Sequence, residues 1–288
     1  MLQRLPTNIQ GWATYFDHAS LPVLRHTVVR LAEMREDLDS VSGHDIAEVV
    51  LHDPLMTLKV IRYIQAKRMG QSSRTEITTI DHALMMLGLT PFFRHFSELS
   101  IIEDALAQHP LALEGVRHVI LRARHAACFA SDWAMLRVDR EVEEVEVAAL
   151  QHHLVEILMW VYAPEPMIRM TNLLKSQTGM RSADAQVEVF GFKLNDLQLK
   201  LVAQWHLPQL LRSLMDDTRT LLPRQRCALL AVALARHHAN GWEDPALPDD
   251  YQSIAKLLGL SEEGAIGRIQ RVAGQVANEL VWYGEAKE

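Results

Sequence analysis

The sequence predicts an all-α fold. Runs of alternating Val, Ile and Thr joined by Asn-Gly turns, which are typical of β-hairpins, are missing from the 288 residues. Apolar residues recur instead at intervals of three and four, which is the period of a helix face. Proline, glycine, hydroxyl and carboxylate residues stand where such segments should begin or end. We therefore expect a protein that is helical throughout, with at most a short hairpin near Gln71–Ile77.

Residues that favour helix ends divide the N-terminal third into short helices. Asp53 followed by Pro54 combines an N-cap with proline at the first helical position, so one helix should end and the next should begin there. Thr79 should cap a helix that Gly88 closes, because a threonine hydroxyl accepts backbone N–H bonds and glycine tolerates the left-handed conformation. The other helices expected in this third cover residues 22–34 and 46–50 and the stretch Thr90–Ile101.

The segment Ala148–Tyr162 carries apolar residues on nearly every side of a helix. A helix that is apolar all round is normally a central one, so this segment is expected to be one continuous helix and the most buried in the protein. His152 and His153 stand in its middle and should point about 100° apart. If these two side chains are buried, each should hydrogen-bond to a neighbouring helix.

Other segments in the remainder of the chain also follow a helical pattern. A long helix should run from about Leu113 to Leu136 after Pro110. The acidic run Glu141–Glu146 should form a solvated first turn, where negative charge suits the helix dipole. Ser261 should cap the last long helix. The remaining helices are expected near residues 167–174, 183–190, 194–205, 221–238, 251–258 and 261–283.

Composition limits the classes of function. The length suits one large domain or two small ones. The formal net charge of −7 argues against a nucleic-acid partner, because phosphate binding needs a concentrated basic surface. No uncharged apolar run reaches the length of a membrane span, and the first residues lack the apolar core of a signal peptide. Cys128 and Cys227 lie in apolar patterns, which is typical of buried free thiols, and we expect a cytoplasmic protein.

Histidines are the main candidates for metal chemistry. His125 and His152 could meet if their helices pack side by side, with His153 and Glu156 near in sequence. A two-metal phosphohydrolase, however, needs carboxylates that bridge the cations and balance their charge, and a neutral imidazole adds no negative charge. Buried, hydrogen-bonded histidines are therefore favoured over a metal site. The sequence has neither a nucleophile elbow nor a glycine-rich phosphate loop.

A small basic group, Arg117, Arg122 and Arg124, lies on the predicted long helix. Two interpretations stay open for it. The favoured one is a solvated helix face, and the alternative is a binding site for an anionic partner or a nucleotide phosphate.

Several short motifs occur in a characteristic order and spacing. They are Leu21-Pro22-Val23-Leu24, Asp45-Ile46-Ala47, Asp53-Pro54-Leu55-Met56, the series Ile77, Ile80, Ala83 and Leu87-Gly88, then Ala148-Ala149-Leu150-Gln151-His152-His153, and Trp205-His206-Leu207-Pro208. Together they resemble the HDOD domain, a signalling relative of the HD metal-dependent phosphohydrolases, over about residues 20–218. The resemblance implies a multi-helix HD-like bundle with additional C-terminal helices. We expect an N-terminal helical segment (1–19), an HDOD-like helical domain (20–218) and a C-terminal helical extension packed on that domain (219–288).

The resemblance also assigns the positions of a metal site, most of which have changed. His125 matches the first ligand histidine of the active HD enzymes, and His152 matches the second. His153 stands where those enzymes have the essential aspartate, and Glu156 stands where the family often has a lysine. The resemblance therefore implies a vestigial site without a catalytic residue, a bound metal or a cofactor. The positions at which further ligands would be expected are Leu194, Thr218 and Arg219.

These features predict a non-catalytic regulatory protein of the HDOD type. By resemblance, it would act through recognition of a signalling protein or a small effector, coupled to a rearrangement of helices. The alternative is an HD-type metal-dependent phosphohydrolase or phosphodiesterase with an unusual site at His125, His152 and His153. The identity of the signalling partner and self-association into a homo-oligomer stay open.

Overall fold

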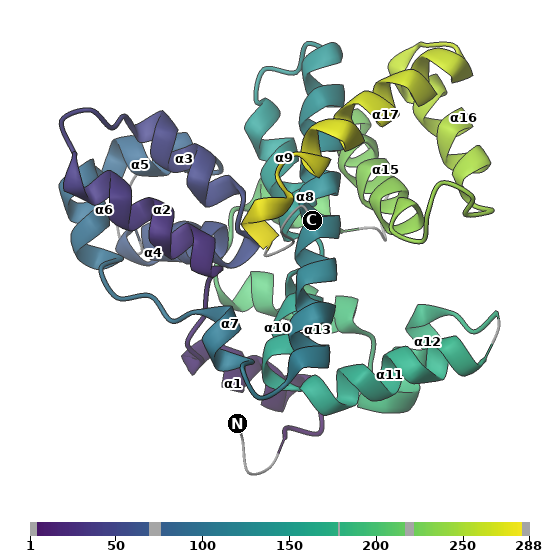
Figure 1. Cartoon of the computed structure of the whole chain (residues 1–288), viewed down its shortest axis with the longest axis horizontal. Coiled ribbons are helices and arrows are strands. Elements are labelled where there is room, and N and C mark those ends of the chain that lie inside the picture. The colour runs from purple at the N-terminus through teal and green to yellow at the C-terminus, as the bar shows by residue number, and fades with distance from the viewer. Residues whose placement is uncertain (1–4, 69–75, 178, 217–221, 284–288) are drawn as a thin grey trace.

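Helices make up the regular structure of the described part of the chain, which contains no strand (Figure 1). The computed structural model describes residues 5–68, 76–177, 179–216 and 222–283. Within these ranges Val23 and Ile101 form an isolated parallel bridge, and the all-α prediction is confirmed. Most of the hairpin expected near Gln71–Ile77 lies outside the described residues. A search of the described helices finds none with the length and apolar character needed to span a bilayer.

A long helix, α8, separates two series of shorter ones. The helices before it are α1 (Ile9–His18), α2 (Arg25–Glu36), α3 (Gly43–Leu51), α4 (Pro54–Arg68), α5 (Ile80–Leu87), α6 (Leu89–His95) and α7 (Ile102–Ala105). Helix α8 covers Pro110–Leu136. The helices after it are α9 (Val142–Gln151), α10 (Leu154–Tyr162), α11 (Pro164–Ser176), α12 (Ser182–Phe190), α13 (Leu194–Gln204), α14 (Gln209–Met215), α15 (Pro223–His238), α16 (Leu247–Leu258), α17 (Glu262–Ala277) and the short 3₁₀ turn η1 (Leu280–Tyr283).

Several predicted helix ends agree with the structure. At the start of α5 the Thr79 hydroxyl accepts a hydrogen bond from the backbone N–H of His82. Gly88 follows that helix with φ of 79°, a conformation that costs a residue with a Cβ more than it costs glycine. At the start of α17 the Ser261 hydroxyl accepts from the backbone N–H of Gly264. Local capping chemistry thus defines these boundaries.

The Asp53 carboxylate joins two parts of the chain from a fully buried position. One oxygen accepts hydrogen bonds from the backbone N–H groups of Leu55 and Met56 at the start of α4. The other accepts from the backbone N–H of Leu24 and the hydroxyl of Thr27. The predicted N-cap is therefore present, and it also fixes α2 against α4.

Helix α8 passes from one hydrophobic core into a second. The apolar residues of its first half, such as Val116 and Ile120, belong to a core shared with α1–α7, α10 and α13. Phe129 and Trp133 of its second half belong to a core shared with α15, α16 and α17. Figure 1 shows the corresponding arrangement, with α15–α17 gathered around the upper part of α8. The C-terminal helices are thus packed against the same element that supports the N-terminal ones.

The helix expected over Thr90–Ile101 is wrong in its second half. Helix α6 ends at His95, and α7 does not begin until Ile102. The intervening backbone pairs with the segment before α2. The Val23 N–H donates to the Ser100 carbonyl (2.8 Å), and the Ile102 N–H donates to the Val23 carbonyl (2.9 Å). These long-range bonds replace helical ones.

The continuous helix expected over Ala148–Tyr162 is also wrong. The structure divides the segment into α9 and α10, with His152 and His153 in the turn between them. Burial of the segment is as expected, because its apolar residues are at most 6% exposed except for Tyr162. Neither proline nor glycine stands at the break. Its cause is a contact from another helix, described below.

The acidic run Glu141–Glu146 is not a solvated turn, contrary to expectation. The Glu143 carboxylate accepts a hydrogen bond from the backbone N–H of Ile80 at the start of α5. Glu144 is buried and pairs with Arg224 of α15 at 2.8 Å. The run therefore links α9 to both halves of the molecule, which a charge pattern in the sequence does not reveal.

Candidate functional site

The turn at His152 and His153 is held open by Gln198 of α13. The Gln198 side chain donates to the carbonyl oxygen of His152 (2.7 Å) and accepts from the backbone N–H of Val155 (3.2 Å). Both are backbone groups that a continuous helix would pair internally. Because Gln198 is 2% exposed, this amide satisfies the interrupted helix within the protein interior.

His153 contacts a partly buried ion pair between Arg122 and Glu156. The Arg122 guanidinium lies 2.5 Å from a Glu156 carboxylate oxygen, and His153 Nδ1 lies 3.4 Å from the same oxygen. Burial opposes ionisation of Glu156, but Arg122 and the His153 hydrogen bond outweigh it and lower the pKa of Glu156 to about 2. Burial, reinforced by Arg122, lowers the pKa of His153. Glu156 is therefore ionised, and the positive charge of Arg122 on α8 balances it.

The ring nitrogens of His152 are buried without comparable support. Neither ring nitrogen has a hydrogen-bond partner among the described protein groups, although an imidazole always carries at least one N–H. Burial, followed by His153, Arg236 and Arg122, lowers the pKa of His152 to about 3. The expectation that each histidine bonds to a neighbouring helix is wrong here, because the partner of His153 lies on α10 itself and His152 has no partner among the residues that the structure describes.

His125 faces in the direction of α15. Its Nδ1 lies 3.1 Å from the carbonyl oxygen of Leu121, one turn earlier on α8. Its ring lies 5.3 Å from that of His238 at the end of α15 and 6.1 Å from that of Phe129. Burial lowers the pKa of His125 to about 4. The described contacts of His125 are thus with α8 and α15, whereas His153 contacts Glu156 of α10.

The arginines of α8 are engaged inside the protein. Arg124 Nε lies 2.9 Å from a carboxylate oxygen of Glu279, and its Nη1 lies 3.4 Å from Glu146. The side chains of Arg122 and Arg124 are only 17% and 10% exposed, so the solvated helix face expected for this group is wrong for both. Arg117 is half-buried, and its Nε has no described hydrogen-bond partner.

The residues at the vestigial positions do not fit a hydrolytic metal centre. The only carboxylate among them, Glu156, is paired with Arg122. The positive charges of Arg122 and Arg236 act on His152, and they would repel a cation there. Within the described ranges, no three His, Cys, Asp or Glu side chains are grouped so that they could hold a metal ion. The donor set lacks the negative charge that a hydrolytic cation requires.

Comparison with known families and structures identifies the fold. A family model of the HDOD domain matches residues 21–220. The chain belongs to the HDOD domain family. The fold of this HDOD protein is similar to that of the MmoQ response regulator from Methylococcus capsulatus str. Bath, with a TM-score of 0.65, 18% identity and coverage of 88% of this chain and 98% of the other. It is also similar to a virulence factor from Campylobacter jejuni subsp. jejuni, with a TM-score of 0.68, 16% identity and coverage of 96% and 99%.

These identities are low enough that the likeness shows the fold alone. A comparison with curated proteins found no match. The family model begins and ends within three residues of the span expected from the motifs, 20–218.

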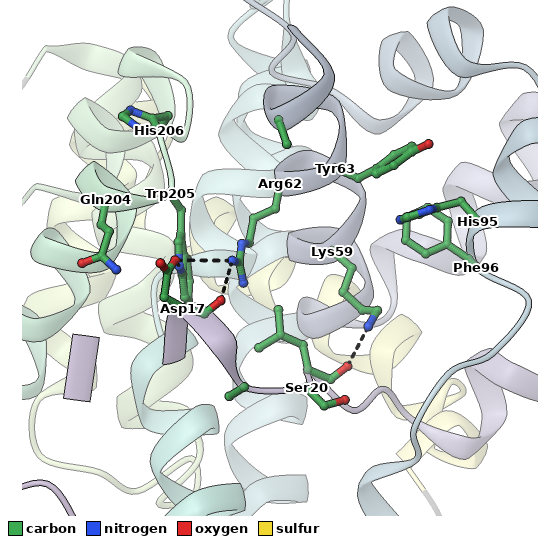
Figure 2. A pocket seen from close by; sticks show the side chains of 13 residues that line it. Asp17, Ser20, Lys59, Arg62, Tyr63, His95, Phe96, Gln204, Trp205 and His206 are labelled. Atoms are coloured by element: carbon green, nitrogen blue, oxygen red, sulfur yellow. Dashed lines mark hydrogen bonds and ion pairs between the residues drawn. The ribbon is translucent and has the colours of Figure 1, made fainter. Parts of the chain in front are cut away.

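A cavity of about 430 Å³ lies away from the vestigial positions, and none of its residues was a candidate in the sequence. Lys59, Arg62 and Tyr63 of α4 line it, together with residues from the ends of α1, α6 and α13 (Figure 2). Leu21, Trp205 and His206 belong to two motifs of the family resemblance, which are the sequence signals that point to this region. The pocket is thus separate from the partly buried turn between α9 and α10 that carries His152 and His153.

Proposed function

We propose that this HDOD protein is a non-catalytic regulator that acts by recognising a signalling protein or a small effector. The observation that carries the proposal is the pairing of Glu156 with Arg122 beside two neutral imidazoles. A hydrolytic centre would need at least one carboxylate free to bind the cation. The only carboxylate at these positions is neutralised from within the protein.

Changing the pairing would not restore a metal site. Freed from Arg122, Glu156 would offer one carboxylate, while His153 stands where the active enzymes have the aspartate. The buried imidazole of His152 lies beside positive charges, which disfavour a cation as they disfavour a proton. These features support a structural role for the turn between α9 and α10.

We also propose that residues 20–218 form the HDOD unit, preceded by a helical segment (1–19) and followed by an extension (219–288) packed on it. The shared core of α8 with α15–α17 supports this division. Phe129 and Trp133 are fully buried in that core and would be exposed without the extension.

The proposal is tested by assaying hydrolysis of cyclic nucleotides, cyclic dinucleotides and nucleoside phosphates with added Mn²⁺, Fe²⁺ or Mg²⁺. We expect no turnover above the rate of the metal alone. Turnover that disappears in His152→Ala but persists in His118→Ala would overturn the proposal and favour an HD-type phosphohydrolase. His118 is a matched control because it is an exposed histidine of α8.

A further inference from the structure

The pocket described above is formed where four separate parts of the chain meet. Figure 2 shows Arg62 pointing from α4 to Asp17 and Trp205, and Lys59 pointing from α4 to the segment at Ser20. Trp205 lies on one side, and His95 and Phe96 lie on the other. The remaining residues that line the pocket include Asp17 and Ser20, with Gln204 and His206 at the end of α13. An occupant would therefore touch helices that are far apart in the sequence.

Two cationic side chains one turn apart dominate the charge of this pocket. The Lys59 ammonium donates to the carbonyl oxygen of Leu21 at 3.1 Å, which is a neutral partner. The Arg62 guanidinium lies 3.8 Å from the Asp17 carboxylate and donates to the Asp17 carbonyl at 3.5 Å, both at the limit of a direct contact. Among the residues that line the pocket, with the histidines counted as neutral, two cations and one carboxylate leave one positive charge. The buried Asp53 carboxylate, which does not line the pocket, also acts on Lys59.

Partial burial makes that charge effective towards an anion. The Arg62 side chain is 24% exposed, and Lys59 is half-buried. Burial lowers the pKa of Lys59, because the ammonium gives up hydration and receives only partial compensation from Asp53. Two donors on one helix, separated by three residues, lie on the same face and can hold one acceptor group between them.

The size and lining of the pocket favour an organic ligand over a bare inorganic anion. A volume of about 430 Å³ exceeds what a bare inorganic anion fills and lies within the range of small-molecule sites. Tyr63 and His95 stack with ring centroids 3.6 Å apart, and Arg62 lies 4.2 Å from the centroid of the Trp205 ring. These aromatic rings and the guanidinium are planar and held in place by one another, so the lining presents polar and aromatic surfaces that suit a planar ligand.

His206 at the edge of the pocket has φ of 52°, in the left-handed region that a side chain with a Cβ adopts at a cost. Strained backbone of this kind is often retained at ligand sites. It turns the chain sharply between Trp205 and Leu207, after the end of α13.

We propose that this pocket binds a small organic anion with one negative charge and a flat ring, held by Lys59 and Arg62. The inference rests on the proposed regulatory function, for which such a molecule would be the effector. A phosphodiester and a carboxylate share this chemistry, and the experiment below distinguishes them.

The direct test uses two fluorescent probes that differ in charge. The probe 8-anilinonaphthalene-1-sulfonate is an aromatic monoanion, and N-phenyl-1-naphthylamine has the same rings without the sulfonate. We expect the full-length protein to bind the anionic probe saturably, at one site, and more tightly than the neutral one. Cyclic AMP should displace the anionic probe if the ligand is a phosphodiester, and indole-3-acetate should do so if it is a carboxylate. Inorganic phosphate at the same concentration should displace neither.

Variants of the two cations show whether the probe occupies this pocket. Lys59→Met and Arg62→Met should each weaken binding of the anionic probe at least tenfold and leave binding of the neutral probe within twofold. Lys59→Arg should retain most of the affinity because it keeps the charge. Lys256→Met is the matched control, since Lys256 is exposed on α16, and it should bind as the parent does. Thermal melts identify any variant that fails to fold. If the Met variants do not fold, Asp17→Asn carries the test, because removing this carboxylate from the lining should tighten binding of the anionic probe, and unchanged binding would overturn the proposal.

The proposal is overturned if folded Lys59→Met and Arg62→Met bind the anionic probe as the parent does, or if the parent prefers neither probe. If inorganic phosphate displaces the anionic probe and the two organic anions do not, the proposal of an organic ligand is overturned. If the probe experiment fails and the protein has no hydrolytic activity, the anion-binding proposal is overturned but the regulatory proposal still holds. Metal-dependent turnover would remove the regulatory proposal, whatever the pocket binds.

Discussion

The arginines of α8 and the cations of α4 are both basic groups on one helix, yet their surroundings differ. Arg122 and Arg124 have carboxylate partners at 2.5 and 2.9 Å, and they are nearly buried. In the α4 pocket, the carboxylate nearest to Arg62 is 3.8 Å away and Lys59 donates to a neutral carbonyl. The first group stabilises the fold, whereas the second retains capacity for an outside anion. Both groups are pairs of basic residues within one turn of a helix, so the sequence pattern does not distinguish a structural role from a binding role, whereas the carboxylate partners in the structure do.

Removing the partner of Arg122 should give the largest effect. In Glu156→Gln the guanidinium would stay buried without a negative charge, and we expect unfolding to become easier by about 4 kcal/mol. Urea denaturation monitored by circular dichroism measures this change. In the double variant Arg122→Met/Glu156→Gln, the unpaired charge is gone and most of the loss should be recovered. A double variant less stable than Glu156→Gln would contradict this account of α8.

Acidification should weaken the fold by a smaller amount. The pKa values of His125 and His152 are lowered to about 4 and about 3, so below pH 6.5 the unfolded chain binds protons that the folded chain does not. The free energy of unfolding should therefore fall between pH 6.5 and pH 4. Burial raises the pKa of Glu143 to about 7, which acts in the opposite direction between pH 4.5 and pH 7. We expect a net loss on the order of 2 kcal/mol.

Denaturation curves at pH 7 and pH 4 measure this loss, and His152→Leu should make it smaller. Equal stability at the two pH values would show that these imidazoles are not kept neutral by burial. Below pH 4, protonation of Glu156 and Glu279, whose pKa values are lowered to about 2 despite burial, should remove further stability.

Replacing His152 itself should stabilise the protein. His152→Leu keeps a similar volume and removes a buried ring whose nitrogens have no described partner, so we expect a gain of about 1 kcal/mol. His153→Leu is the matched change at the next residue. It removes the contact with Glu156 and should destabilise instead. Thermal melts of both variants at pH 7 test the contrast, and equal losses in the two would refute it.

The smallest effect is expected in the α4 pocket. Asp17→Asn removes a carboxylate whose side chain is 39% exposed and 3.8 Å from Arg62, so stability should change by no more than about 0.5 kcal/mol. The same variant should bind 8-anilinonaphthalene-1-sulfonate more tightly, because the pocket gains one net positive charge. A loss of stability as large as that of Glu156→Gln would show that the two basic groups have the same role.

Helix ends were predictable where a cap is local. Thr79, Gly88 and Ser261 act within one turn of their own helix, so the sequence alone contains the relevant interactions. The break at His152 was not predictable in the same way. It depends on Gln198, which is 46 residues away. An apolar run without proline or glycine correctly indicates burial but does not specify which distant side chain will pair with its backbone.

The candidate site shows the same limit. The family resemblance leads us to expect His125, His152, His153 and Glu156 at the positions of a former metal site, but it does not reveal that Arg122 neutralises the carboxylate. The pocket residues come from α1, α4, α6 and α13, and only their folded arrangement brings the cations together. Likewise, the acidic run Glu141–Glu146 reads as a solvated turn because its partners lie in other helices.

The end of the described chain has a consequence for how the protein is made. The Tyr283 hydroxyl donates to the carbonyl of His52, 231 residues earlier, and Trp282 stacks on the His52 ring at 4.3 Å. Glu279 completes this contact by pairing with His52 and with Arg124. During synthesis from the N-terminus these groups emerge long after α2 and α3, so the face formed by those two helices stays uncovered until residues 279–283 have been made. A chain that stops short of residue 279 would leave Arg124 without its nearest carboxylate and so carry a defect in the N-terminal half of the molecule.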